Sequence, residues 1–555
     1  MAGIADFLDS LIGGFSLICF CFAVGSLFWG LCVLRPWQHE AGYTPQLLER
    51  TVKLLWLGSF ALAGTQLFKI ILKVWLMTVV LDKWPFPEFA ETTQFIGGII
   101  RASLTFVLAG YCYKTLSKNP YSKSYWQTAA ILALPMILAG AWLVHAAGRF
   151  DNPYLLMGLT VIHQLAAAAW IGGVFHLVNI WLMRSKKQVP RELWPMLLKR
   201  FSWFGTASVS VILITGIPMA LQYIDTWNGF IGTGYGNLLM VKIILLGLAL
   251  SLAWLNKTTV AHYWVSRNNH ALNYRVPYYI EAEAFVLITL LFTAASLASQ
   301  PPAIDIPNLT ASWQEVLDMF SPRIPRIASP SHQALIAGEA GRVAIIGQVP
   351  SEAATAWSDY NHNIAGIFLT TMSFFAMLSY IKRLPSAFSA FDRYIAYLPR
   401  YWPIGFVLLG IFLFFRSDAE TWPLGPIGFW ESTFNNGEVL QHRIATLLVF
   451  VLGLIELFAR LPRYQNSQLP YFFPILAAFG GLMLLTHSHV GFQAKSAFLI
   501  QVGHTLMGVF SLILACGRWL ELKLDKPGKN IAGFVSVAAL FQIGLILVFY
   551  REPLY

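Results

Sequence analysis

Twelve histidines are the residues of this sequence best suited to chemistry, and two of them stand one serine apart at the end of an apolar run. These two are His487 and His489, in the stretch LLTHSHVG. Neutral imidazole is the commonest metal ligand in proteins, and it is costly to leave unpaired in an apolar environment. The stretch therefore predicts a metal or cofactor site, provided that further ligands lie at the same depth.

The elements that would position these histidines are membrane-spanning helices. Of the 555 residues, 57% are hydrophobic and only 12% are charged, which is not the composition of a soluble domain. About 20 apolar residues cross ~30 Å of hydrocarbon as a helix, and we expect about fourteen such segments. They lie near residues 11–34, 54–80, 93–113, 126–147, 155–183, 203–224, 237–257, 279–298, 363–381, 402–416, 438–459, 471–488, 497–517 and 531–550. The predicted fold is an all-α polytopic membrane bundle.

The basic residues of the connecting loops predict the orientation of these helices. Every second loop is rich in Lys and Arg, as near residues 184–200 and 518–529, whereas the intervening loops carry acids, as near residues 418–431. Because basic loops stay in the cytoplasm, both termini are expected outside. Topology and anionic membrane lipid then account for the net charge of +11, and nucleic-acid binding is not expected.

This orientation places seven histidines in the outer half of the membrane or at its rim. His163 lies inside the fifth segment, and His504 lies about two turns into the thirteenth. The other five begin or end segments at the same face: His145, His362, His442, His487 and His489. His176 stands in the inner half of the fifth segment. Clustering at one depth favours a shared metal site over separately buried imidazoles.

Copper and haem are the two ligands that this histidine set favours. Met507 follows His504 by three residues, so both lie on one helical face. A thioether together with an imidazole suits copper, as Cu(I) or Cu(II). Met is also a common filler of apolar cores. Haem b is the alternative, since membrane bundles hold it between facing histidines. His163 and His176 lie roughly 140° apart around their helix, which disfavours two haems there. A single outer haem between His163 and His442 or His504 stays open.

Several motifs resemble those of one family, in that family's order. The N-terminal motifs are HQLAAAAWIGGVFHL from His163, RFSWFGTASVSVILITG from Arg200, YGNLLMVKIILL from Tyr235 and ASQPPA from Ala298. The C-terminal motifs are SPRIPRIASPSHQAL, SDYNHNIAG, RSDAETWPLGPIGFWES, LQHR, LLTHSH and GHTLMG. Together they resemble the copper resistance protein D (CopD) family in its long bacterial form. The Gly-Gly of the first motif also predicts the close approach of another helix.

The resemblance implies a multi-pass protein of the bacterial inner membrane that takes copper from the periplasmic side and moves it inward. It also implies a CopC-like periplasmic copper carrier as partner at the outer face. The matching positions carry the family's histidines: His163, His176, His362, His442, His487, His489 and His504. Haem-based electron transfer stays open, as does delivery of copper to a cuproenzyme at the outer face without transport. No P-loop, HExxH or dinucleotide motif favours an enzyme.

The sequence predicts three parts. Residues 1–298 form an eight-helix CopD-like membrane domain, and residues 362–555 form a six-helix membrane domain. Residues 299–361 form an extracytoplasmic segment in which SWQEVLDMF predicts a short amphipathic helix.

Overall fold

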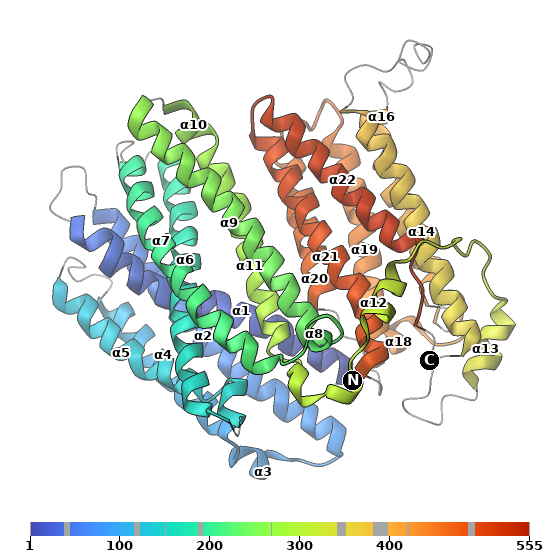
Figure 1. Cartoon of the computed structure of the whole chain (residues 1–555), viewed down its shortest axis with the longest axis horizontal. Coiled ribbons are helices and arrows are strands. Elements are labelled where there is room, and N and C mark those ends of the chain that lie inside the picture. The colour runs from blue at the N-terminus through green and yellow to red at the C-terminus, as the bar shows by residue number, and fades with distance from the viewer. Residues whose placement is uncertain are drawn as a thin grey trace. The chain divides into compact units, whose positions relative to one another are not determined.

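The computed structural model describes residues 2–37, 45–115, 122–149, 151–186, 193–267, 269–340, 351–380, 398–418, 421–486 and 494–553 (Figure 1). Within these ranges the regular structure is helical, apart from an isolated bridge between Thr421 and Ile427. The prediction of an all-α protein is confirmed.

The chain forms two compact units. The N-terminal unit comprises residues 8–225 and 245–299, and the C-terminal unit comprises residues 1–7, 226–244 and 300–555. The division of the sequence into parts at residues 298 and 361 stays a prediction.

The N-terminal unit contains eight long helices. They are α1 (Ala2–Phe28), α2 (Pro45–Leu81), α4 (Thr93–Thr115), α5 (Lys123–Ala141), α6 (Pro153–Ser185), α7 (Leu193–Tyr223), most of α9 (Gly234–Ser266) and α11 (Val276–Leu297). Short helices are α3 (Phe86–Ala90) and α10 (Asn269–Tyr274). The predicted close approach at the Gly-Gly is present, because a Cβ on Gly172 would lie 2.7 Å from the Cα of Gly25 on α1. Only glycine permits this contact of α1 with α6.

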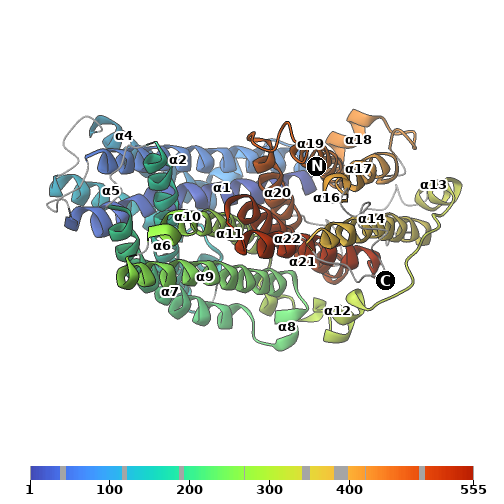
Figure 2. The same cartoon turned by 90° about the horizontal axis from the view of Figure 1, so that it is seen from above.

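The C-terminal unit is built from a second set of helices. They are α8 (Trp227–Ile231), α12 (Trp313–Phe320), α13 (His332–Ala340), α14 (Glu352–Leu378), α16 (Leu398–Tyr401), α17 (Ile404–Arg416), α18 (Phe429–Asn435), α19 (Gly437–Ala459), α20 (Phe472–Thr486), α21 (Ala494–Lys523) and α22 (Gly528–Val548). Helix α22 packs against both α14 and α21, and α12 lies beside α8 (Figure 2). Helix α12 begins with a capping box formed by Ser312 and Glu315.

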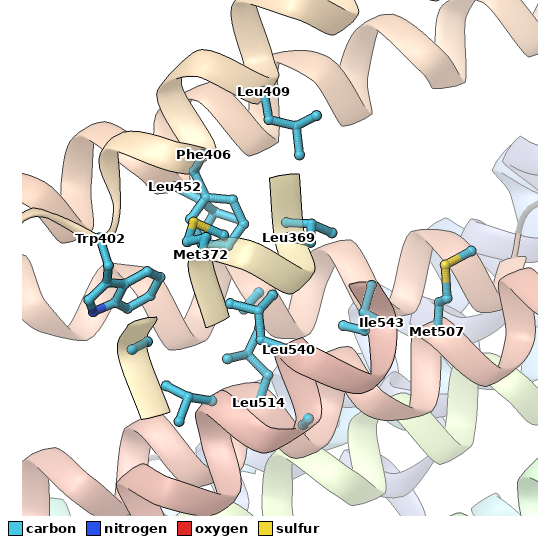
Figure 3. Close-up of a cluster of buried hydrophobic side chains, with 14 of the residues drawn as sticks. Leu369, Met372, Trp402, Phe406, Leu409, Leu452, Met507, Leu514, Leu540 and Ile543 are labelled. Carbon is cyan, nitrogen blue, oxygen red and sulfur yellow. The ribbon is translucent and has the colours of Figure 1, made fainter. Parts of the chain in front are cut away.

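An apolar core holds the C-terminal unit together (Figure 3). Helices α14, α17, α19, α21 and α22 supply buried Leu369, Met372, Phe406, Leu409, Leu452, Leu514, Leu540 and Ile543. The contact of α14 with α22 is close, since a Cβ on Gly544 would lie 2.6 Å from the backbone nitrogen of Thr370. This packing fixes the relative positions of the polar residues at the helix ends.

Twelve helices among the described residues are long and apolar enough to cross a membrane, and each coincides with a predicted segment. The chain is a multi-pass membrane protein. Several helices begin before the predicted segment, as α7 does at Leu193 rather than near residue 203. Helical structure continues into the head-group region, where hydropathy no longer marks the chain.

The two other predicted segments form helices that differ from the twelve. Helix α14 has 27 residues, but its first turns carry the polar stretch SDYNHN. Helix α17 has 13 residues, or roughly 20 Å, which is shorter than the ~30 Å of hydrocarbon. Both helices pack within the C-terminal unit.

Candidate functional site

The two units divide the predicted site histidines between them. The N-terminal unit holds His145, His163 and His176, and the C-terminal unit holds His362, His442 and His504. His145 begins a short 3-10 turn, His145–Gly148, and its side chain is outside the described part of the structure. The opening pair, His487 and His489, also lies outside the described residues.

His176 is enclosed among aromatic and hydroxyl side chains of the N-terminal unit. The residue is 2% exposed, and its ring stacks on Trp29 with ring centroids 5.3 Å apart. Its Nε2 lies 2.9 Å from Ser26 Oγ. Because the Ser26 hydroxyl already donates to the Phe22 carbonyl, the imidazole donates to Ser26. His176 is thus a packed histidine with a satisfied Nε2.

His163 is half-buried where α6 meets α7. Its Nδ1 lies 3.0 Å from Thr215 Oγ1, and Thr215 donates its own proton to the Val211 carbonyl at 2.7 Å. His163 therefore donates through Nδ1, and its Nε2 carries the lone pair.

His362 and His504 meet in the C-terminal unit beside Tyr550. His362 comes from α14, His504 comes from α21, and Tyr550 follows the end of α22. The two imidazole centroids are 6.0 Å apart, at an angle of 83° between the rings. The Tyr550 ring stacks on His362 with centroids 3.9 Å apart. Three segments that are distant in sequence thus meet at one place.

His362 and His504 each donate the Nδ1 proton to a backbone carbonyl. His362 Nδ1 lies 2.8 Å from the Ser358 carbonyl, and His504 Nδ1 lies 2.9 Å from the Ile500 carbonyl. A carbonyl oxygen only accepts hydrogen bonds, so Nδ1 carries the proton in both rings. The lone pair is then on Nε2, as in metal-binding histidines whose other ring nitrogen is held by a carbonyl or carboxylate.

His442 has the same arrangement with a carboxylate as acceptor. Its Nδ1 lies 2.9 Å from Asp418 Oδ1, and it is close enough to His362 and His504 to interact electrostatically with both. Burial raises the pKa of the Asp418 carboxyl, but the neighbouring His442 and Ser417 outweigh burial and hold this pKa below its ordinary value. Asp418 therefore stays ionised beside the imidazole.

Arg443 fixes the loop that presents Asp418. Its guanidinium donates to the Phe429 carbonyl and to Thr433 Oγ1, and it donates to Thr421 Oγ1 at 3.2 Å. The central carbon of the guanidinium, Cζ, also lies over the Phe429 ring, 3.9 Å from the ring centroid. The arginine thus ties α18 and the Thr421 segment to α19, next to His442.

Sequence reasoning missed the residues around the histidines. Ser358 Oγ and the Tyr550 hydroxyl both donate to Glu552 Oε1, at 2.6 and 2.9 Å. The Glu552 backbone donates to Asp359 Oδ1 at 2.8 Å. The only sequence signal was that Ser358 and Asp359 adjoin His362 in SDYNHNIAG. Nothing local marked Tyr550 or Glu552.

A surface pocket opens beside Tyr550 in the C-terminal unit. Its lining includes Asp359, Asn363 and three arginines, which are Arg323, Arg326 and Arg551. The pocket is therefore predominantly basic.

The described residues do not form a complete metal cage. Among them, no three side chains of His, Cys, Asp or Glu are placed to hold one metal ion together. Met507 is 3% exposed and belongs to the apolar cluster of the C-terminal unit (Figure 3). The described site is a set of oriented imidazoles.

Comparisons with known proteins agree with the motifs. Residues 195–297, from α7 to the end of α11, match the family model described as copper resistance protein D. The copper transport protein CutJ of Bacillus subtilis (strain 168) is 28% identical over 285 residues, which are 50% of this chain and 50% of that protein. The inner membrane protein YebZ of Escherichia coli (strain K12) is 31% identical over 137 residues, which are 24% of this chain and 46% of that protein.

The chain spans about half the length of the curated relatives it matches. No solved structure matches. The family model, the order of the motifs and the helical architecture agree, and residues 195–297 of the chain are similar to the copper resistance protein D family.

Proposed function

We propose that the protein binds copper at the histidines of its C-terminal unit and passes the ion inward across the membrane. The observation that carries this proposal is the shared orientation of His362, His442 and His504, each of which donates through Nδ1 to a fixed acceptor. Imidazoles held in this way carry the lone pair on Nε2, which is the nitrogen that then binds a metal.

Copper is the metal that the ligand chemistry and the relatives favour together. Imidazole suits copper among the transition metals, and thioether or thiolate is the softer complement. The matched family is described by copper resistance, and the Bacillus relative is described as a copper transport protein. We assign copper as the cargo, in the state Cu(I) or Cu(II).

The proposed ligand set starts from His362 and His504 and extends to His442. The predicted ligands His487 and His489 would complete it from the same face. Met507 is left out of the set because its side chain packs in the apolar core. His163 and His176 belong to the N-terminal unit and would serve a later stage of the passage.

The pocket beside Tyr550 supports a partner at the outer face. Its three arginines are complementary to an acidic protein surface, and charge complementarity speeds and orients docking. A periplasmic copper carrier of the CopC type with acidic residues around its own metal site would fit this surface.

Copper analysis of the purified full-length protein tests the site. Wild-type protein loaded with copper and then washed should retain about one ion per chain, because oriented imidazoles bind copper tightly. The double variant His362→Ala/His504→Ala should retain less than about a tenth of it. His262→Ala is the matched control, since this exposed histidine of α9 lies far along the chain from the site.

The outcomes separate the three readings. Equal copper in the double variant and the control would contradict the site. A Soret band that shifts on reduction would show that the protein binds haem b, and the haem reading would then replace the copper reading. Uptake of radioactive copper into right-side-out vesicles should fall in the double variant. Copper binding without any uptake by the wild type would leave delivery to a cuproenzyme as the function.

A further inference from the structure

An acidic side chain is buried inside the N-terminal unit. Glu283 lies on α11, seven residues after Val276, or roughly 10 Å along the helix. This helix is part of the apolar span Asn269–Leu297, and Glu283 is only 3% exposed. An ionisable residue in such a place is costly unless it has a partner or a function.

The neighbours of Glu283 are neutral. Asn256 on α9 donates from Nδ2 to Glu283 Oε2 at 3.2 Å, and the indole N–H of Trp170 on α6 also donates toward this carboxyl group. Among the described residues Glu283 makes no ion pair. A carboxylate in an apolar interior without a cation is strongly disfavoured, whereas the neutral acid is tolerated.

The titratable groups of the neighbouring elements have other partners. His176 of α6 bonds to Ser26, Arg184 of α6 bonds to Asn273 of α10, and Lys257 of α9 donates to Thr206. His270 of α10 stacks on Tyr274, and Asp9 of α1 pairs with Lys69. Glu281, on α11 itself, is half-buried and two residues away. Among the described residues, the side chains that act on the Glu283 carboxyl are the neutral Asn256 and Trp170.

Asn256 supplies an independent indication that this carboxyl takes up a proton. The residue is 9% exposed, and its Oδ1 is a buried acceptor without a hydrogen-bond partner. A half-turn of the amide would bring Oδ1 to the carboxyl group, where it would accept the O–H of a protonated Glu283. The amide can thus match either state, by donating to the carboxylate or by accepting from the acid.

We propose that Glu283 and Asn256 form a proton-binding site inside the membrane, in which Glu283 holds a proton at neutral pH. The amide of Asn256 turns to follow the arrival and departure of the proton. Both residues lie in the segment that matches the family model, residues 195–297. The site goes beyond copper binding and does not depend on it.

Infrared difference spectroscopy of the purified full-length protein tests the site. Spectra recorded between neutral and alkaline pH should show the C=O stretch of a protonated carboxyl group at neutral pH, with the downward shift in D2O that marks an exchangeable proton. Glu283→Gln should lose this band. Glu281→Gln, the same change two residues away on α11, should retain it.

Two further variants keep the test decisive. Asn256→Ala should move the band to higher frequency, because the acid loses a hydrogen-bond acceptor. Glu283→Asp should keep a shifted band and serves if Glu283→Gln does not fold. A wild-type protein without the band at neutral pH, or a folded Glu283→Gln protein that retains it, would overturn the proposal. An unmoved band in Asn256→Ala would remove Asn256 from the site.

Discussion

At the scale of single residues, the state of each imidazole follows from one hydrogen bond. His362 and His504 use backbone carbonyls of their own helices, four residues earlier in each case. His442 uses a carboxylate from another segment, Asp418. A carboxylate also makes the imidazole more basic and a better ligand. His442 is therefore the histidine whose metal affinity depends most on a neighbouring side chain.

We expect Asp418→Asn to weaken copper binding by about 10- to 100-fold, because loss of an outer carboxylate partner has this effect at histidine metal sites. Competition of the purified protein with a copper chelator measures the affinity. Glu431→Gln, an exposed acid of the neighbouring helix α18, is the matched control and should bind copper as the wild type does. Equal affinities for Asp418→Asn and the control would exclude His442 from the site.

At the scale of the elements, a buried charge network joins the helices that carry the site. Glu456 on α19 accepts from Arg460 at 2.7 Å and pairs with Arg518 of α21 at 2.9 Å. Arg518 also pairs with Glu521, which accepts from the Tyr380 hydroxyl at 2.6 Å. The network lies roughly 21 Å along α19 and α21 from His442 and His504. It therefore fixes the far ends of these helices.

We expect Glu456→Gln to destabilise the protein by about 3–5 kcal/mol, because two arginines then share the one carboxylate of Glu521 and a buried positive charge is left uncompensated. Thermal unfolding in detergent measures this as a lower Tm. Glu352→Gln, an exposed acid in the first turn of α14, is the control.

A second variant identifies the cause of that loss. Adding Arg460→Gln to Glu456→Gln should recover part of the lost stability, because the excess positive charge is removed and Arg518 keeps its pair with Glu521. A wild-type Tm in the single variant would show that the network does not hold the helices.

At the scale of the whole molecule, orientation in the membrane decides at which face the proposed copper site lies. The alternation of basic and acidic loops predicts that residues 300–361 are outside and that the loop after α9 is cytoplasmic. Two well-exposed apolar side chains mark these regions: Ile324, 96% exposed, in the first, and Val265, 86% exposed, in the last turn of α9 next to the second.

We expect a membrane-impermeant maleimide to label Ile324→Cys in intact cells and to leave Val265→Cys unlabelled until the membrane is opened. The background protein lacks its five cysteines, Cys19, Cys21, Cys32, Cys112 and Cys516. The reverse labelling pattern would place the histidine site at the cytoplasmic face and reverse the proposed direction of transport.

The sequence by itself determined the helices, because hydropathy acts on about 20 consecutive residues and needs no distant partner. It also predicted the close approach at Gly172, since a Gly-Gly in an apolar helix is a local signal. Local information also made candidates of three histidines, His362, His442 and His504. The depth of each in the membrane follows from its position within its own helix.

Only the tertiary structure decided which of these candidates meet. His362 and His504 are brought together by the packing of α14, α22 and α21, while His163 and His176 lie in the other unit. Asp418, Tyr550 and Glu552 join the histidines through contacts between segments far apart in the chain. Such contacts depend on how whole helices pack, and no local pattern of residues encodes that choice.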